Sequence, residues 1–377
     1  MSDFFKTHGV NVGEGRPTAF RNADDIYQDG TLPMCRDSSG KLWAISGISH
    51  LGHIGMFCGS CPDDLKEVYP IQMLFSTSHS DYAFSGIRYP EGVCARGSVW
   101  PFGLYICPKT NRFFCFFHNE TGWFGLGTAY DALGLCDTPH YDSDFRHIGL
   151  MHSDDEGKSW VFDRWVLTAE QPCFTEIYDP GAGRARGQAR GRICLGSGDF
   201  SLFVEPQGEY MYLVYNKVWV NTETSAWEDC DVYLARTRKR DDGLMGDFVK
   251  YYEGSFCEPG NLGKETAILH RAWHARIAYL QKYGQYILSY SPMQPSGNIG
   301  EVVIDELKLR TSQDMIHWSE PYSVLREGKP FGNHYAALAP EEKEGSPCVI
   351  PADDFVVLLN HNGTDVTQYP AKFVLKK

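Results

Sequence analysis

Paired strand-like runs recur along the chain, and this repetition limits the possible folds more than any other feature. Each pair joins two runs of β-branched and aromatic residues through a short turn with Gly, Asp or Asn, the pattern of a β-hairpin. The pairs are Gln28–Asp37 with Lys41–Ile48, Val99–Cys107 with Phe113–His118, Phe200–Glu205 with Tyr210–Asn216, Arg276–Gln281 with Gln285–Ser291, and Ser346–Ile350 with Phe355–Asn360. Such a series predicts a radial repeat with insertions of unequal length between its units.

Two turn motifs follow later strands of these units. The run from Ser153 to Trp160 has the pattern S-x-D-x-G-x-x-W and resembles the Asp-box of sialidase-type propellers. The run from Ser312 to Trp318 resembles the S-x-D-x-x-x-W turn of the five-bladed furanosidase propellers, which include glycoside hydrolase families 43 and 32. A degenerate copy lies at Pro62–Leu65. In each, Ser and Asp are expected to close the turn by local hydrogen bonds while Trp packs beneath it.

The resemblance implies an all-β fold, a five-bladed β-propeller with four-stranded antiparallel blades. We expect residues 1–377 to form this single domain, because propellers of such length need no second core. The acidic segment Ala19–Ile26 is expected beside the final blade, where it would help to close the ring and remove exposed sheet edges. A composition with 14% aromatic residues, 38 Gly and 20 Pro fits many short strands separated by turns.

Charge and cysteine content exclude several classes of function. The net charge of −13 disfavours binding to nucleic acids and anionic membranes. Lys6 and His8 stand where a signal peptide would need an apolar core, so we predict a cytoplasmic protein. The 12 cysteines are spread along a long chain, and Cys58 and Cys61 form a C-x-x-C that lacks a second pair. Reduced thiols, no metal and no cofactor are therefore expected.

Polar residues gather where a propeller has its funnel. The start of each innermost strand and the end of the next strand lie on one face, so side chains at these positions share one space. Carboxylates, imidazoles and aromatic rings suit a sugar, which needs both stacking and hydrogen bonds. We predict these substrate-binding residues: His50, Trp100, His118, Lys217, Trp273, His274, Arg276, His334, Tyr335 and His361. A structural role is the alternative for each of them, and for Trp100 and Trp273 it has equal weight.

Two short segments carry the catalytic resemblance. Tyr27-Gln28-Asp29-Gly30 is similar to the first-blade strand whose Asp is the base or nucleophile in the furanosidase propellers. Gly198-Asp199-Phe200 is similar to the third-blade strand whose Asp tunes the acid and orients the substrate. The resemblance therefore implies these roles for Asp29 and Asp199, while the alternative for both is capping of a turn.

The general acid is harder to place. The family has a Glu in its fourth blade, whereas Arg271–Arg276 contains none. Glu120 is the preferred candidate and Glu91 the second, although Glu120 is equally suited to pair with Arg96. Glu265 and His274 are further alternatives.

These observations favour a glycoside hydrolase for small glycosides or oligosaccharides, furanosides among them. A glycoside phosphorylase, a uronate lyase and a carbohydrate-binding propeller without catalysis are the alternatives. The expected partner is a small carbohydrate, and assembly into a homo-oligomer is compatible with the sequence. The Gly/Arg-rich loop Gly181–Arg192 is either a solvated excursion or a lid that brings guanidinium groups to an anionic substrate.

Overall fold

The chain is nearly all β in a computed structural model. The structure describes residues 4–21, 32–48, 53–70, 98–120, 146–169, 177–179, 184–186, 191–221, 226–295, 302–303, 305–333, 335–341, 345–361 and 365–376. Within these ranges the one helix is α1 (Phe4–Thr7), and no helix there is long and apolar enough to cross a membrane.

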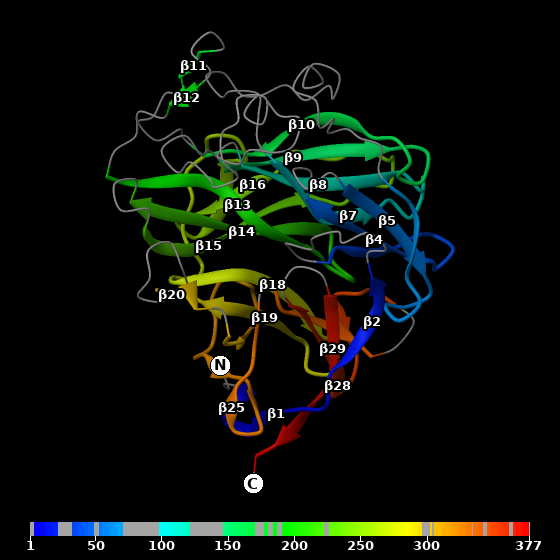
Figure 1. The fold of residues 1–377 in the computed structure, drawn as a ribbon, viewed down its shortest axis with the longest axis vertical. Helices are drawn as coiled ribbons and strands as arrows, with labels where there is room; N and C mark the ends of the chain where they lie inside the picture. Colours follow the sequence, from blue (N-terminus) through cyan, green and yellow to red (C-terminus); the bar gives the residue numbers. More distant parts are fainter. Residues whose placement is uncertain are drawn as a thin grey trace.

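The strands form successive antiparallel meanders (Figure 1). The first contains β3 (Met34–Arg36), β4 (Leu42–Ile48), β5 (His53–Gly59) and β6 (Lys66–Pro70). The second contains β7 (Ser98–Ile106), β8 (Phe113–Glu120), β9 (Arg146–Ser153) and β10 (Val161–Leu167). The third contains β13 (Arg192–Val204), β14 (Tyr210–Asn221), β15 (Ala226–Arg238), β16 (Val249–Tyr252) and β17 (Ser255–Pro259).

Two further meanders complete the main chain path. One contains β18 (Ala272–Leu280), β19 (Gln285–Pro292), β22 (Lys308–Ser312) and β23 (Tyr322–Ser323). The other contains β26 (Ala337–Pro340), β28 (Asp354–His361) and β29 (Asp365–Leu375), joined by β1 (His8–Val12) and β2 (Arg16–Arg21). Short pairs lie outside them: β11 (Ile177–Asp179) with β12 (Arg184–Arg186), β20 (Gln294–Pro295) with β21 (Val302–Val303), and β24 (Leu325–Arg326) with β25 (Lys329–Pro330).

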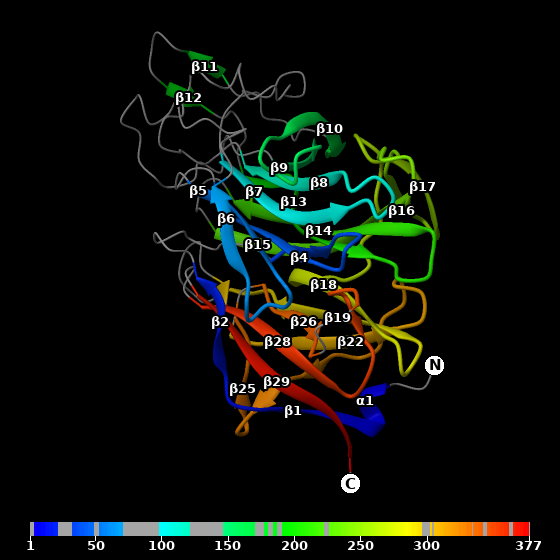
Figure 2. The same ribbon diagram turned by 90° about the vertical axis from the view of Figure 1, so that its right-hand side faces the viewer.

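The first strands of the chain pair with the last. Both β1 and β2 are antiparallel to β29, with His8 opposite Leu375 and Arg16 opposite Gln368. The N-terminal segment therefore lies against the final meander, as expected, and both termini are at the same end of the molecule (Figures 1 and 2). Of the segment Ala19–Ile26, the residues after Arg21 lie outside the described part. This pairing gives β29 partners on both of its edges and removes an exposed strand edge.

The second and third meanders meet in one nine-stranded sheet. The contact is a parallel pairing of Gly196 in β13 with Arg146 in β9. Gly196 has a φ of 105°, and a Cβ at this position would lie 2.3 Å from the Arg146 carbonyl oxygen. Glycine is therefore required here by both backbone conformation and close approach.

The predicted hairpins are found, with one wrong pairing. We expected Ser346–Ile350 to pair with Phe355–Asn360, but β28 pairs instead with β26, so that Ala337 is opposite Leu358. The short strand β27 (Val349–Ile350) runs parallel to β18 of the preceding meander. Because Pro347 has no N–H to donate, this segment is a poor hairpin strand, whereas the small side chains of Ala337 and Ala339 are almost fully buried.

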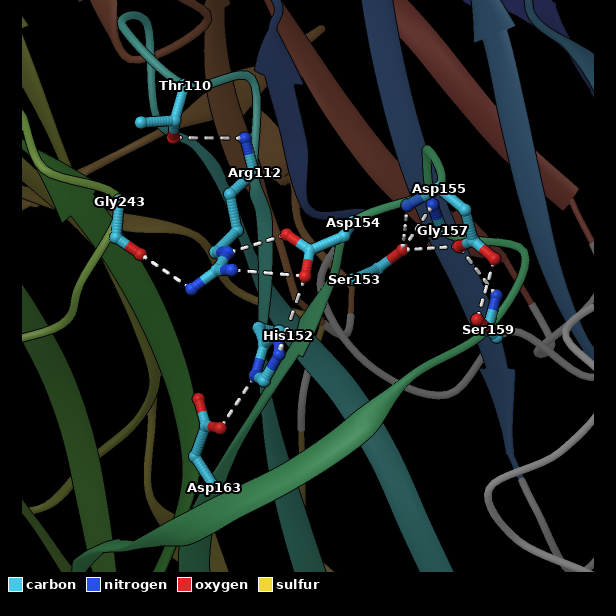
Figure 3. Close-up of polar contacts among 10 residues, drawn as sticks. All are labelled: Thr110, Arg112, His152, Ser153, Asp154, Asp155, Gly157, Ser159, Asp163 and Gly243. Carbon is cyan, nitrogen blue, oxygen red and sulfur yellow. Dashed lines mark hydrogen bonds and ion pairs between the residues drawn. The ribbon is translucent and has the colours of Figure 1, made fainter.

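The predicted Ser/Asp turn between β9 and β10 is closed by local hydrogen bonds (Figure 3). Ser153 donates from its hydroxyl to Asp155 at 2.7 Å, and Asp155 accepts from the Ser159 N–H at 2.8 Å. The buried Trp160 donates from its indole N–H to the Gly157 carbonyl at 2.9 Å. The turn after Ser312 uses the same chemistry, because the Asp314 carboxylate there accepts the N–H groups of the residues two and three positions later.

Replacement of Asp155 by Ala should destabilise the protein by about 1–3 kcal/mol, because three hydrogen bonds to the carboxylate are lost. The neighbouring Asp154 provides a matched control. It forms an ion pair with Arg112 at 2.6 Å, but its side chain is 62% exposed. Asp154→Ala should therefore cost less than about 1 kcal/mol. Urea unfolding of both variants tests this, and equal losses would show that the turn has no special role.

Candidate functional site

Four charged or titratable side chains meet where the second and third meanders come together. His118 and Glu120 come from the end of β8, Arg146 from the start of β9, and Asp199 from β13. All four residues are buried, with Asp199 the most exposed at 7%. We call these four residues the charged cluster. Charges in such a place require partners, because removal from water is costly for an unpaired ion.

Arg146 is the centre of the charged cluster. One of its terminal nitrogens lies 2.9 Å from Glu120 Oε1, and the other lies 3.4 Å from Asp199 Oδ2. His118 Nε2 approaches the same Glu120 oxygen at 3.0 Å. One guanidinium therefore bridges two carboxylates that belong to different meanders, and its planar fork suits such a contact.

The backbone fixes the protonation of His118. The Asp199 N–H donates to His118 Nδ1 at 2.9 Å, so that nitrogen is an acceptor and carries no proton. In the neutral ring the proton is then on Nε2, which faces Glu120. Gly198 makes this approach possible, because a Cβ there would lie 2.2 Å from the His118 ring.

The first strands of three meanders carry β-bulges near the cluster. The ladder shifts register around Phe102 in β7, around Asp199 in β13, and between Trp273 and Arg276 in β18. A bulge bends its strand and turns a side chain in a new direction. Asp199 and His274 have φ values of 39° and 53°, which is a strained conformation for residues with a Cβ.

Tyr335, just before β26, has the same left-handed conformation with a φ of 51°. Its hydroxyl donates to Asp199 Oδ1 at 3.2 Å. The His274 ring stacks on the Tyr335 ring with 3.8 Å between centroids, and the His274 N–H donates to Asn216 Oδ1 at 3.2 Å. The strained residues thus contact one another directly or through one intermediate, which fixes the position of Asp199 from several strands.

Burial raises the pKa of Asp199 above its ordinary value. His118 and the positively charged Arg146 oppose this shift, while the nearby Glu120 adds to it. Desolvation prevails because the carboxyl group is almost without contact with water. Asp199 is therefore the member of the charged cluster whose protonated form is favoured by its surroundings.

The donor set of the cluster also resembles a metal site. Single ligand atoms of His118, Glu120 and Asp199 lie within 4.8 Å of one another. Arg146, however, already places a positive charge against both carboxylates, and His118 Nδ1 accepts a backbone hydrogen bond. The arrangement is an internally neutralised ion cluster, in which a divalent cation would compete with the guanidinium for the same oxygens.

A second buried ion network lies on β14 and β16. Glu265 accepts from Tyr215 at 2.6 Å and lies 2.5 Å from Lys217 Nζ and 2.9 Å from Lys250 Nζ. Burial opposes ionisation of Glu265, but the two lysines outweigh it and its pKa is lowered. Glu265 is therefore a poor proton donor. Lys217, predicted to bind substrate, has Glu265 as its ion-pair partner.

The structure brings together many of the predicted site residues. His118, Glu120, Asp199, His274 and Tyr335 are in or beside the charged cluster, and the Trp100 ring lies 5.3 Å from that of His118.

Other predicted residues have different surroundings. Trp273 stacks on Trp227 at 4.5 Å in an apolar cluster, which favours the core role. Arg276 lines a separate cavity. Asp29, Glu91, His50 and His334 lie outside the described residues, as does the side chain of His361.

Arg146 is the residue that sequence reasoning missed. We searched the starts of innermost strands and the ends of the strands that follow, whereas Arg146 begins the third strand of its meander. We expected Arg96 as the partner of Glu120, but Arg96 is outside the described residues and Arg146 forms that ion pair. The signal in the sequence was Arg146 itself, a charged residue at the start of a run whose middle, Ile148–Met151, is apolar.

The chain is similar in fold to several proteins of known structure. No family model and no curated sequence matches the chain. Zg3597, a family 117 glycoside hydrolase of the marine bacterium Zobellia galactanivorans, matches with a TM-score of 0.51 and 9% identity, over 99% of this chain and 92% of that one.

Two other solved structures match less well. The catalytic domain of a GH62 α-L-arabinofuranosidase from Coprinopsis cinerea has a TM-score of 0.48 and 9% identity, over 97% of both chains. A Penicillium chrysogenum α-L-arabinanase complexed with arabinobiose has a TM-score of 0.44 and 13% identity, over 97% and 98% of the two chains. The matched structures are β-propeller hydrolases, and the expected resemblance is confirmed at the level of fold.

The Asp199→Asn variant should gain stability relative to the native protein as the pH rises. Since the folded pKa of Asp199 is above the ordinary value of 3.8, ionisation costs more in the folded state than in the unfolded chain. This cost is absent below pH 3.8 and complete above the folded pKa. Asparagine keeps one acceptor oxygen at this position without charge and tolerates a positive φ. Urea unfolding of both proteins between pH 4 and pH 8 measures the difference, and a difference that is constant with pH would contradict the account.

Proposed function

We propose that the chain is a glycoside hydrolase that acts on a small carbohydrate, furanosides included. The observation that carries the proposal is the pair of buried carboxylates, Glu120 at the end of β8 and Asp199 inside β13, whose oxygens lie close together. Glycoside cleavage requires one carboxyl that is protonated and one that is ionised. The surroundings of this pair favour that division.

We also infer that the successive meanders are the five blades of a propeller. Strands β3, β7, β13, β18 and β26 each contribute residues to one cavity, so one strand from every meander faces a common axis. The pairing of β1 and β2 with β29 would then close the ring. The Ser/Asp turns after β9 and β22 support an Asp-box origin for the outer halves of two blades.

The geometry supports Asp199 as the proton donor. Burial keeps its carboxyl protonated at a higher pH than usual, and Tyr335 holds its orientation. Glu120 contacts Arg146 and His118, two groups that stabilise a carboxylate in its charged form. Glu120 would therefore remain ionised and face the positive charge that develops at the anomeric carbon. These roles differ from the sequence-based assignment, in which Glu120 or Glu91 donated the proton and Asp199 tuned it.

Further roles complete the proposed mechanism. Asp29 stays the proposed base or nucleophile, with Glu91 as a second carboxylate near the funnel. His118, His274, Tyr335 and Trp100 would contact the sugar, and the positions of His50, His334 and His361 stay predictions.

A screen of aryl glycosides tests the activity, with furanosides and pyranosides offered with and without inorganic phosphate. We expect hydrolysis that is independent of phosphate. Phosphate-dependent turnover would identify a phosphorylase, and a product that absorbs in the ultraviolet would identify a lyase. Sugar binding without any turnover would leave a carbohydrate-binding scaffold.

Glu120→Gln and Asp199→Asn should each reduce kcat/KM about 100-fold or more on the best substrate, since acid–base groups contribute on this scale. Glu209→Gln is the control, because this carboxylate is 69% exposed and pairs with Arg238 at the surface. Circular dichroism should show that all three variants are folded. Full activity of folded Asp199→Asn would refute its assignment as the proton donor.

A further inference from the structure

A cavity lies next to the charged cluster, on the other side of the Phe102 ring. The cavity is small and partly open to solvent, and residues of β3, β7, β13, β18 and β26 line it. Phe102 belongs to the lining and also stacks beside His118, with 5.5 Å between ring centroids. Its edge packs against Tyr335 at 5.6 Å. The cavity is therefore a space distinct from the charged cluster, with one aromatic ring between them.

Most of the residues that line the cavity are apolar, although polar atoms form the larger part of its surface, and it carries a single charge among the described residues. Met34, Leu104, Leu202 and Leu338 provide aliphatic walls. Arg276 is the charged member, and it lies directly across the β18–β19 ladder from Ser289, which also lines the cavity. Its side chain is half-buried, so the guanidinium has lost part of its hydration.

Within the described part of the chain, Arg276 has no compensating partner. Its Nη1 atom is buried and forms no hydrogen bond to any described residue. Burial lowers the pKa of Arg276 to about 10, and the one group that opposes this shift is the thiol of Cys348. The side chain is still charged at neutral pH. Among the described residues, this half-buried positive charge thus has no carboxylate beside it.

Two other cations in the interior, Arg146 and Lys250, differ from Arg276 because both have partners in the described part of the chain. Arg146 is shared by two carboxylates, and Lys250 lies 2.9 Å from Glu265 and donates to two backbone carbonyls. An unpaired buried charge costs several kcal/mol, whereas a paired one is largely compensated. No described residue supplies such a partner to Arg276, so we expect a bound anion to take that place.

We propose that this cavity is a binding site for a small oxyanion, a carboxylate or a phosphate, held by the guanidinium of Arg276. The planar fork of an arginine matches two oxygens of either group, and partial exclusion of water from this half-buried position strengthens the attraction. An anion here would act on stability, since it would neutralise a charge at the point where five strands converge. This inference does not depend on the proposed hydrolase activity.

Thermal unfolding of the full chain in Tris chloride tests the site, with sodium acetate and inorganic phosphate added as separate probes. The unfolding temperature of the native protein should rise with probe concentration, on the order of 5 °C at about 100 times Kd. The probe that acts at lower concentration identifies the preferred oxyanion, and sodium chloride at equal ionic strength shows the contribution of a halide.

Arg276→Met is the decisive variant, because methionine fills a similar space without charge. It should unfold at the same or a higher temperature than the native protein in Tris chloride, and it should not respond to either oxyanion. Arg276→Lys keeps the charge but loses the fork, so we expect its Kd to rise about tenfold. Arg238→Met, which removes an arginine that is 68% exposed, should respond as the native protein does.

Calorimetric titration of the native protein with each probe keeps the test independent of how the variants fold. One bound oxyanion per chain supports the proposal. Absence of binding to the native protein, or an equal thermal response of Arg276→Met, would overturn it and would leave Arg276 a purely structural residue. Either result is separate from the fate of the hydrolase proposal, which rests on Glu120 and Asp199.

Discussion

The ion pairs of Arg146 with Glu120 and Asp199 are the interaction on which the centre of the molecule depends. Each carboxylate alone would be a buried charge, and so would the guanidinium. Together they neutralise much of one another and join the second meander to the third. The contact requires β9 and β13 to approach closely, which the glycine at position 196 permits. The electrostatics of the site and the packing of the sheet are therefore one constraint.

Strain at the innermost strands follows from the same arrangement. Asp199, His274 and Tyr335 all adopt left-handed backbone conformations, and each contacts at least one of the others. Such conformations persist only where the surrounding structure determines them. Here the long β13–β14 ladder and the Asn216 side chain provide that support. Functional groups thus sit on rigid strands, which suits a site that must hold a carboxyl in a fixed position.

Arg146 and Arg276 have opposite surroundings. Arg146 is satisfied by carboxylates of the chain itself, so it has little capacity left for an anionic ligand. Arg276 lines the cavity and has no such partner among the described residues. A bound anion therefore fits the cavity better than the carboxylate pair. Arg146 and Arg276 carry the same charge, so what distinguishes them is the residues around each guanidinium.

Local patterns in the sequence determined the hairpins and the Ser/Asp turns. Alternating apolar residues, turn residues and short-range hydrogen bonds all act within about ten residues of one another, so they can be recognised without a fold. The position of Glu120 at the end of its strand followed from the same patterns, whereas Asp199, expected at the entry of a strand, lies inside β13, which begins at Arg192. The tertiary structure decided what lies far apart in the chain. In it, β26 rather than Ser346–Ile350 is the partner of β28. Lys217 forms an ion pair with Glu265, and Arg146 lies between two carboxylates. These outcomes depend on which strands meet in space, and no local pattern contains that information.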